Sequence, residues 1–219
     1  MKNVATKRFV LVATLAVLFA TSLTACIPLV VGGAVVGGTL VANDRRTSGA
    51  QLEDEGIELR STSRIRSNIG DRAHVNVSSY NRQVLLTGEV PTAQDKLLVE
   101  QIISKVENVS SVVNELAVMG NSSLIQRSSD VLVTGRVKAL LVDAKDLFAN
   151  SFRVVTERGT TYLMGRVTQR EADRGTAVAR GTPGVQKVVR IFEIISEEEL
   201  ARQLPTPAKP PAAKPAVSN

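Results

Sequence analysis

Aromatic residues, cysteine and histidine are scarce in this chain. Aromatics make up 3% of its 219 residues, and tryptophan is absent. The cores must therefore be built from aliphatic side chains, and surfaces that stack nucleic-acid bases on aromatic rings are not expected. There is one cysteine, Cys26, and one histidine, His74. A single thiol excludes a disulfide within the monomer, and we find no cluster of metal ligands in the sequence.

Residue patterns that support catalysis are also missing. His74 falls at the start of a predicted strand, where a structural role is expected, and no base accompanies Cys26 in the sequence. The acidic pair Asp143 and Asp146 falls on a predicted helix surface. We therefore predict that the protein is not an enzyme and that it has no cofactor and no metal.

The first 25 residues have the layout of a secretory signal. Lys2, Lys7 and Arg8 precede an apolar segment over residues 9–23, and small residues follow it. This pattern predicts that residues 1–25 are removed and that the chain leaves the cytoplasm. Because an exported chain meets little nucleic acid, we expect no nucleic-acid partner despite the net charge of +6.

Residues 26–51 are predicted to tether the folded part of the chain. The apolar stretch 27–42 has 16 residues, fewer than the roughly 20 that a membrane-spanning helix needs. Its doubled glycines are not followed by the Lys-Ser or Lys-Thr of a phosphate-binding loop. Two interpretations stay open, a tether that lies against the membrane and a plain flexible spacer.

The chain contains an internal repeat. Residues 83–90 and 160–167 are both alternating apolar runs interrupted by one glycine, Gly88 in the first and Gly165 in the second. Each run is followed by a helix-forming stretch and then a Val-rich strand. The sequence therefore predicts two copies of one small module. Their expected bounds are 52–118 and 129–196, with a linker over 119–128.

Each copy is predicted to be a small three-stranded mixed sheet with two helices packed on it, an α+β fold in the order α-β-β-α-β. In the first copy the expected elements are a helix over 52–69, strands over 74–79 and 83–90, a helix over 92–106 and a strand over 111–118. In the second copy they are a helix over 130–148, strands over 152–157 and 160–167, a helix over 169–180 and a strand over 185–195.

Residues 197–219 are expected to form a short helix and then a disordered tail. The tail is rich in Pro, Ala and Lys, a composition that favours extended chain and cannot build a core. It could reach a partner in the cell envelope, or it could be passive.

The two copies carry opposite net charge. Residues 52–118 contain 7 Lys and Arg against 10 Asp and Glu, a net charge of −3. Residues 129–196 contain 11 against 7, a net charge of +4. The basic copy is the one expected to face phosphate groups, although a small difference of this kind can also arise by drift.

The first helix of the basic copy offers a candidate contact surface. Four of its residues are expected to face the sheet: Val133, Val137, Leu140 and Ala144. Val131 and Leu132 fall beside this stripe, with Arg136 and Lys138 nearby. They would form an apolar wedge next to two cations, which suits an anionic bilayer. The alternative is that Val131 and Leu132 pack under the other copy.

Both copies resemble the BON domain. The resemblance lies in a strand that ends in an apolar-x-Gly-x-Val pattern, a helix, a Gly-Val pair and a Val-Val-Asn-type strand. The matching residues are Leu86-Thr87-Gly88-Glu89-Val90, Asn108-Val109 and Val112-Val113-Asn114, and then Leu163-Met164-Gly165-Arg166-Val167, Gly184-Val185 and Val188-Val189-Arg190. The chain departs from the pattern at Asn108, where glycine is usual, and at Arg190, where asparagine is usual.

A second resemblance concerns the end of the signal. Leu23-Thr24-Ala25-Cys26 resembles the lipobox of bacterial lipoproteins. It implies that Cys26 carries a diacylglyceryl group and an acylated amino terminus after cleavage. Ile27 stands where an aspartate would retain such a protein at the inner membrane, so the resemblance implies transport to the outer membrane.

The lipobox, the tether and the tandem copies together resemble dual-BON outer-membrane lipoproteins. That resemblance implies a periplasm-facing protein that supports envelope integrity at division sites. It also implies binding of anionic phospholipid, phosphatidylglycerol or cardiolipin, through the second copy. We expect Val131, Leu132, Arg136, Lys138 and Gly165 at the lipid site, and for Gly165 a bulge or close backbone approach is the alternative. The competing function is a protein adaptor for outer-membrane assembly or the division machinery.

Overall fold

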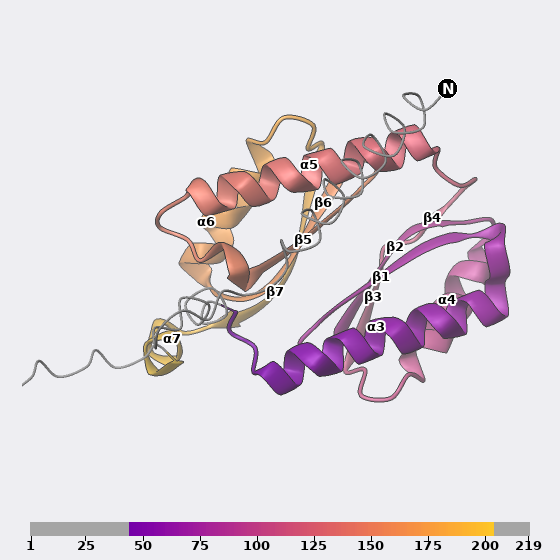
Figure 1. The fold of residues 1–219 in the computed structure, drawn as a ribbon, viewed down its shortest axis with the longest axis horizontal. Coiled ribbons are helices and arrows are strands. Elements are labelled where there is room, and N and C mark those ends of the chain that lie inside the picture. The colour runs from indigo at the N-terminus through magenta and orange to yellow at the C-terminus, as the bar shows by residue number, and fades with distance from the viewer. Residues whose placement is uncertain (1–43, 204–219) are drawn as a thin grey trace, which may run out of the picture. The chain divides into compact units, whose positions relative to one another are not determined.

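The computed structural model describes residues 44–203. Each copy of the repeat folds as a small sheet with helices on one face (Figure 1). The elements of the first copy are helix α3 (Ser48–Ile69), the 3-10 turn η2 (Gly70–Arg72), strands β1 (His74–Tyr80) and β2 (Gln83–Val90), helix α4 (Ala93–Ser104) and strands β3 (Ser111–Asn114) and β4 (Ala117–Val118).

The second copy repeats this order. Its elements are helix α5 (Leu124–Asp143), the 3-10 turn η3 (Ala149–Ser151), strands β5 (Phe152–Glu157) and β6 (Thr160–Thr168), helix α6 (Gln169–Arg180), strand β7 (Lys187–Ile195) and the short helix α7 (Glu197–Gln203). In each copy the middle strand pairs antiparallel with the strand before it and parallel with the strand after the helix. The predicted α+β fold of two tandem modules is thus confirmed.

Two helices begin earlier than the sequence pattern indicated, because a hydroxyl side chain caps each of them. Helix α5 starts at Leu124 rather than near Asp130, with the Ser123 side chain accepting a hydrogen bond from the Gln126 amide. Residues 124–128 of the expected linker are therefore helical. Helix α3 starts at Ser48, capped by Thr47, so the last residues of the expected tether are helical too.

Two other elements end differently from the expectation. The closing strand of the first copy is interrupted, since the Leu116 amide donates to the Asn114 side chain and the chain pairs again only as β4. Helix α5 ends at Asp143, and Leu147 turns into the core from outside the helix. Hydrophobic spacing alone predicts that this helix continues to residue 148, five residues too far.

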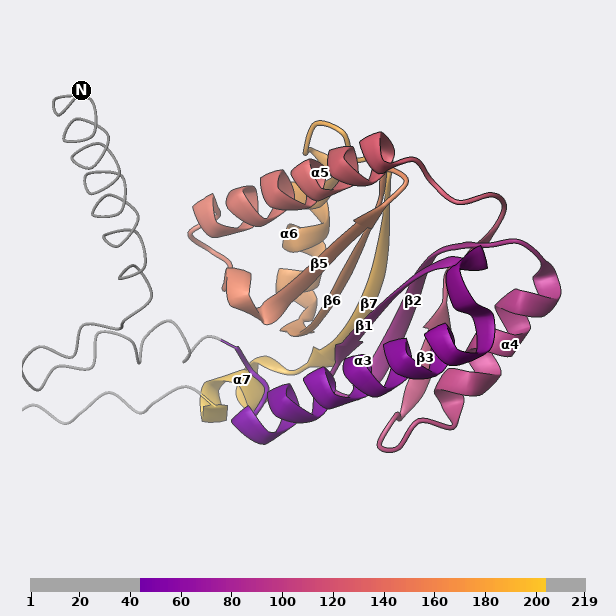
Figure 2. The same ribbon diagram turned by 45° about the vertical axis from the view of Figure 1, so that its right-hand side comes forward.

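The helices of each copy cover one face of its sheet (Figure 2). A separate apolar core lies between helices and sheet in each copy, aliphatic in the first and with Phe152 among the buried residues of the second. Strand residues alternate between two faces, so every second side chain of β2 and β6 points away from these cores. Val84 and Leu86 lie in the first core, and Leu163 lies in the second. The residues that alternate with these along each strand, such as Leu85 of β2 and Met164 of β6, belong to a third cluster.

The third cluster joins the two copies. Its buried residues come from strands of both sheets and are Tyr80, Leu85, Tyr162, Met164 and Ile191. The sheet face that carries no helix in one copy is therefore covered by the corresponding face of the other. This arrangement answers a question that the sequence left open, because each copy alone would expose an apolar sheet face.

Several predictions fall outside the described residues. They are the signal over 1–25, lipidation of Cys26, the tether up to residue 43 and the tail over 204–219. Among residues 44–203, no helix is both long enough and apolar enough to cross a bilayer.

Candidate functional site

The outer face of α5 is an exposed apolar surface. Leu132 is 62% exposed and Val131 is 70% exposed, so neither packs under the first copy. On this side of the helix three further large apolar side chains are exposed, which are Leu124, Ile125 and Val142. We call these five residues the α5 outer face. A cluster of exposed apolar side chains on one helix is unusual for a surface that meets only water.

The opposite side of α5 holds the helix on the sheet. Its buried residues are Asp130, Val133, Val137 and Leu141. Leu141 occupies the position that the sequence analysis gave to Leu140, which is instead 40% exposed. The spacing of the buried residues follows steps of three and four, which fixes Val131 and Leu132 on the outside.

Two cations accompany the α5 outer face. Arg136 is exposed, and its guanidinium donates to the Pro183 carbonyl oxygen at 3.4 Å. Lys138 is also exposed. Viewed down the helix axis, Arg136 and Lys138 lie on opposite sides of Leu132. Between them lies Gly135, whose surroundings are open, since an added Cβ would meet no atom within 4 Å. The helix thus presents apolar and positive groups together on one side.

Gly165 lies elsewhere, buried in β6. A Cβ built on it would stand 2.3 Å from the Ser151 carbonyl oxygen. This close backbone approach accounts for the glycine without a ligand. The structure brings together Val131, Leu132, Arg136 and Lys138 on α5 and does not bring Gly165 to them.

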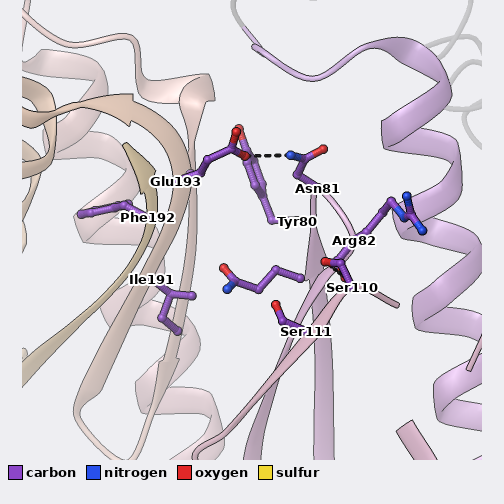
Figure 3. Close-up of a pocket in the computed structure, with 10 residues that line it drawn as sticks. Tyr80, Asn81, Arg82, Ser110, Ser111, Ile191, Phe192 and Glu193 are labelled. Atoms are coloured by element: carbon purple, nitrogen blue, oxygen red, sulfur yellow. Dashed lines mark hydrogen bonds between the residues drawn. The ribbon is translucent and has the colours of Figure 1, made fainter. Parts of the chain in front are cut away.

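A cleft of about 500 Å³ opens where the two copies meet (Figure 3). Its lining comes from the β1–β2 turn and the start of β3 in one copy and from β6 and β7 in the other. The Asn81 side-chain amide donates to Glu193 Oε2 across the cleft at 2.7 Å. Arg82, at the rim, donates to the Asn108 carbonyl oxygen. Asn81 and Glu193 therefore bind each other, Arg82 is held by a backbone carbonyl, and no nucleophile–base pair is present among the lining residues.

A buried carboxylate fixes the hairpin turn in each copy. Asp54 of α3 accepts hydrogen bonds from the backbone amides of Asn81 and Arg82 at 2.7 and 2.8 Å. Asp130 of α5 accepts from the amides of Arg158 and Gly159 at 2.8 and 3.0 Å. The sequence analysis missed both, and aligning the two copies on Gly88 and Gly165 places Asp54 opposite Val131, one residue away from Asp130.

Asp54 has more partners than its counterpart. It also accepts from the Ser79 hydroxyl at 2.6 Å and pairs with Arg46 at 2.7 Å. Burial acts to raise the pKa of Asp54, but the hydrogen bonds from Ser79, Arg82 and Arg46 outweigh it, and the pKa falls below 3.8. The Arg46 guanidinium lies 4.3 Å from the centre of the Tyr80 ring.

Arg45 attaches the start of the described chain to the second copy. Both of its terminal nitrogens donate to the Glu171 carboxylate at 2.7 Å, and the two side chains are 6% and 0% exposed. Glu171 also accepts from the Thr168 amide at the start of α6. Burial acts to raise the pKa of Glu171, and the hydrogen bonds from Arg45 and Thr168 lower it further than burial raises it.

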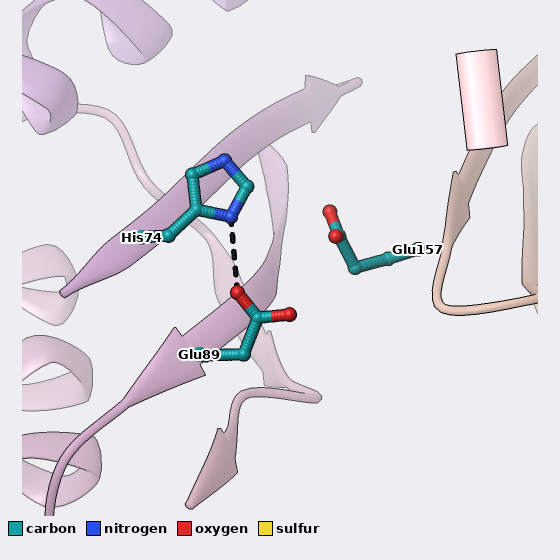
Figure 4. A group of neighbouring side chains, drawn as sticks. All are labelled: His74, Glu89 and Glu157. Carbon is teal, nitrogen blue, oxygen red and sulfur yellow. Dashed lines mark hydrogen bonds and ion pairs between the residues drawn. The ribbon is translucent and has the colours of Figure 1, made fainter. Parts of the chain in front are cut away.

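His74, Glu89 and Glu157 form a group that the sequence analysis also missed, with both carboxylates buried and His74 half-buried (Figure 4). His74 and Glu89 are cross-strand partners in the first copy, and Glu157 ends β5 in the second. Burial raises the pKa of Glu157, and the neighbouring Glu89 adds to this rise. In Glu89, burial is outweighed by hydrogen bonds from Ser122 and His74, so its pKa is lowered.

Comparison with known proteins identifies the family. The BON domain model matches residues 54–120 and 129–195. The outer membrane lipoprotein DolP of Haemophilus influenzae is 35% identical over 173 residues, which cover 78% of this chain and 89% of that protein. A 21 kDa hemolysin of Actinobacillus pleuropneumoniae is 29% identical over 154 residues, 69% of this chain and 79% of that protein.

Solved structures add little to this comparison. The C-terminal domain of CdsD, a structural protein of the type III secretion system of Chlamydia trachomatis, is 13% identical. The alignment covers 63% of this chain and 96% of that domain, with a TM-score of 0.28, too low to support an argument.

The matched family and the two sequence relatives are named for a domain, a lipoprotein and a hemolysin, and not for a catalytic activity. The two BON matches cover more than half of the chain, in the same order as the two folded copies. The chain therefore belongs to the BON-domain family, as an outer-membrane lipoprotein with two BON copies that faces the periplasm.

Proposed function

We propose that this protein binds anionic phospholipid through the α5 outer face while an acyl anchor at Cys26 holds it at the outer membrane. In this role it supports the integrity of the cell envelope, probing the inner surface of the membrane at division sites. The observation that carries the proposal is the joint exposure of Leu132 and Val131 beside Arg136 and Lys138 on one helix.

The energetics suit a tethered domain. Burying one leucine contributes about 1.5 to 3 kcal/mol, and each basic residue near an anionic surface contributes about 1 kcal/mol. Leu132 with Arg136 and Lys138 can therefore supply only a few kcal/mol, which corresponds to weak binding by a free domain. An acyl anchor raises the effective concentration of the helix at the membrane, so this weak affinity is sufficient to orient the domain.

Vesicle sedimentation of the unlipidated protein tests the proposal. The protein is expected to bind vesicles that contain phosphatidylglycerol or cardiolipin and to bind neutral vesicles less. Binding should weaken as salt is raised, because the cation contribution is screened. Leu132→Glu should lower the affinity by about tenfold or more, since it removes apolar burial and adds a negative charge.

Leu59→Glu is the matched control. Leu59 is 73% exposed on α3, the corresponding helix of the first copy, so the substitution has a similar effect on solubility without touching α5. It should leave vesicle binding unchanged. Equal binding to neutral and anionic vesicles, or equal losses in the two variants, would contradict the proposal and favour the adaptor function.

A further inference from the structure

We propose that His74, Glu89 and Glu157 bind a divalent transition-metal ion, with Zn²⁺ as the best fit, and that the ion ties the two BON copies together. One ligand atom from each residue lies within 4.8 Å of the others. His74 Nδ1 and Glu89 Oε2 are 3.2 Å apart. The three side chains point toward one another, two from the first copy and one from the second (Figure 4).

The separations suit tetrahedral coordination. Zn²⁺ binds imidazole nitrogen and carboxylate oxygen at about 2.0 to 2.2 Å, which places neighbouring ligand atoms roughly 3.4 Å apart. The His74 and Glu89 atoms already have this separation. Glu157 has to approach by up to about 1.4 Å, the difference between 4.8 Å and the 3.4 Å of a tetrahedral site, and rotation of its side chain can supply this shift. The fourth position would be left to water.

Glu89 has an oxygen that no donor satisfies. The residue is 0% exposed, and its Oε1 accepts no hydrogen bond from the described part of the chain. The nearest cation is the Arg158 guanidinium, at 3.6 Å, beyond hydrogen-bond distance. A buried carboxylate oxygen without a donor is costly to the fold, and a metal ion that contacts both oxygens of Glu89 would remove this cost.

Glu89 and Glu157 bring two carboxylates together in a poorly hydrated place. Glu157 is 7% exposed and Glu89 is fully buried, so water screens their repulsion little. The packing of the apolar cores does not require two carboxylates at this place. A bound divalent cation would turn the repulsion between the copies into attraction, because the ion becomes the largest local charge.

Other side chains already orient the ligands. Both the amide and the hydroxyl of Ser122 donate to Glu89 Oε2 at 3.1 Å. The Asn76 side-chain amide donates to Glu157 Oε2 at 2.8 Å. Hydrogen bonds of this kind hold carboxylate ligands in place around a metal and typically change metal affinity by about 10- to 100-fold.

The donor set selects the kind of ion. An imidazole with two carboxylates suits Zn²⁺ and related transition metals, whereas Mg²⁺ and Ca²⁺ prefer sites built from oxygen alone. Arg158 opposes any cation, since its charge lies beside Glu89. The site is therefore expected to bind Zn²⁺ and to bind Mg²⁺ far more weakly.

Calorimetric titration of the full chain in detergent micelles with Zn²⁺, and separately with Mg²⁺, tests the proposal. We expect one Zn²⁺ per chain and a rise in the unfolding temperature that Mg²⁺ does not give. His74 is the sole histidine, so a Zn²⁺-dependent change in the imidazole NMR signals reports on this residue alone. His74→Gln and Glu157→Gln should each weaken Zn²⁺ binding by about tenfold or more.

Two further variants separate metal binding from an effect on folding. Arg158→Asn removes the opposing charge with a residue that tolerates the positive φ of 52° at this position, and it should strengthen Zn²⁺ binding. Glu58→Gln removes a different ion pair between the copies, with Arg153 at 2.7 Å, and should leave Zn²⁺ binding unchanged. Absence of Zn²⁺ binding, or equal binding by wild type and His74→Gln, would overturn the proposal.

Discussion

The first helices of the two BON copies share a buried face and differ on their outer face. Counted from the buried aspartate, Ile57, Ser61 and Ile65 of α3 correspond to Val133, Val137 and Leu141 of α5. The outer positions diverge, because Glu55 and Gly56 of α3 stand where α5 has Val131 and Leu132. Packing has thus kept one side of the helix in both copies, whereas the apolar pair Val131 and Leu132 has no apolar counterpart at the matching positions of α3.

The two ends of the contact between the copies differ in a similar way. Tyr80 and Glu157 each end the first strand of their hairpin. Tyr80 lies near the second copy, where its hydroxyl donates to the Ser151 carbonyl oxygen and accepts from the Arg166 amide. Glu157 reaches the first copy beside His74 and Glu89. One end is satisfied by neutral hydrogen bonds, and the other carries charge that a cation would balance.

The largest expected effect concerns the aspartates that hold the hairpin turns. Asp54→Ala should lower the free energy of unfolding by about 3 to 5 kcal/mol. It removes the buried partner of Arg46 together with the hydrogen bonds that Asp54 accepts from Ser79 and from the turn amides. Asp130→Ala removes only the two amide contacts and should cost about 1 to 3 kcal/mol. Denaturant unfolding measures both, and equal losses would show that the two turns are held alike.

The acidic residues in the first turns of α4 and α6 give a second comparison. Arg45→Ala would leave Glu171 buried without its cation and should cost about 3 kcal/mol. Arg72 pairs with Asp95 at 2.8 Å but is 53% exposed, so Arg72→Ala should cost about 1 kcal/mol or less. Thermal unfolding of the two variants tests whether burial separates these pairs, and a similar shift for both would contradict it.

The raised pKa of Glu157 predicts a pH effect with a definite sign. Burial favours the neutral acid, so the stability that Glu157 contributes is present below its unfolded pKa near 4.5 and is lost as the pH rises through the raised folded value. The glutamine of Glu157→Gln cannot ionise. This variant should therefore become more stable relative to wild type as the pH rises through the folded pKa of Glu157. Unfolding free energies of both proteins, measured without metal across this range, give the test.

Glu89 and Glu171 should act in the opposite direction. Their pKa values are lowered in the folded protein, so their contributions are present above the unfolded pKa of 4.5 and disappear as the pH falls through the folded values. Acid should therefore destabilise wild type and Glu157→Gln alike. A variant that resisted acid because of the Glu157 substitution would show that the two carboxylates had been assigned wrongly.

At Gly135 a small gain of stability, rather than a loss, is expected. This residue lies in the interior of α5 with open space around it, where an alanine costs nothing sterically. Gly135→Ala should raise the free energy of unfolding by about 1 kcal/mol through backbone entropy. Chemical denaturation measures the change. A loss of stability would indicate that another group contacts position 135, and the outer side of α5 would then not be open as described.

The sequence predicted the repeated fold because local patterns dominate it. Alternation around Gly88 and Gly165 marked the central strands, and the expected bounds of α6, residues 169–180, agree with the structure. Helix starts were misplaced where Ser123 and Thr47 act as caps, since hydrophobic spacing does not register a single hydroxyl group.

The contacts between the copies could not be predicted in this way. Arg45 and Glu171, or His74 and Glu157, are far apart in the sequence and meet only because the two helix-free sheet faces pack together. In contrast, Val131 and Leu132 were recognised as candidates from helical spacing alone. Their exposure decided between the two interpretations that spacing left open, although lipid binding itself stays a prediction.

The most direct test is to compare how deeply the two first helices enter a bilayer. With Cys26 replaced by Ser, a nitroxide label is attached at Val131→Cys or at the corresponding Glu55→Cys, both exposed positions. On anionic vesicles we expect the label at 131 to become accessible to apolar oxygen and shielded from a water-soluble relaxation agent, while the label at 55 stays in water. Equal accessibility of the two labels would contradict the assignment of membrane contact to the second copy.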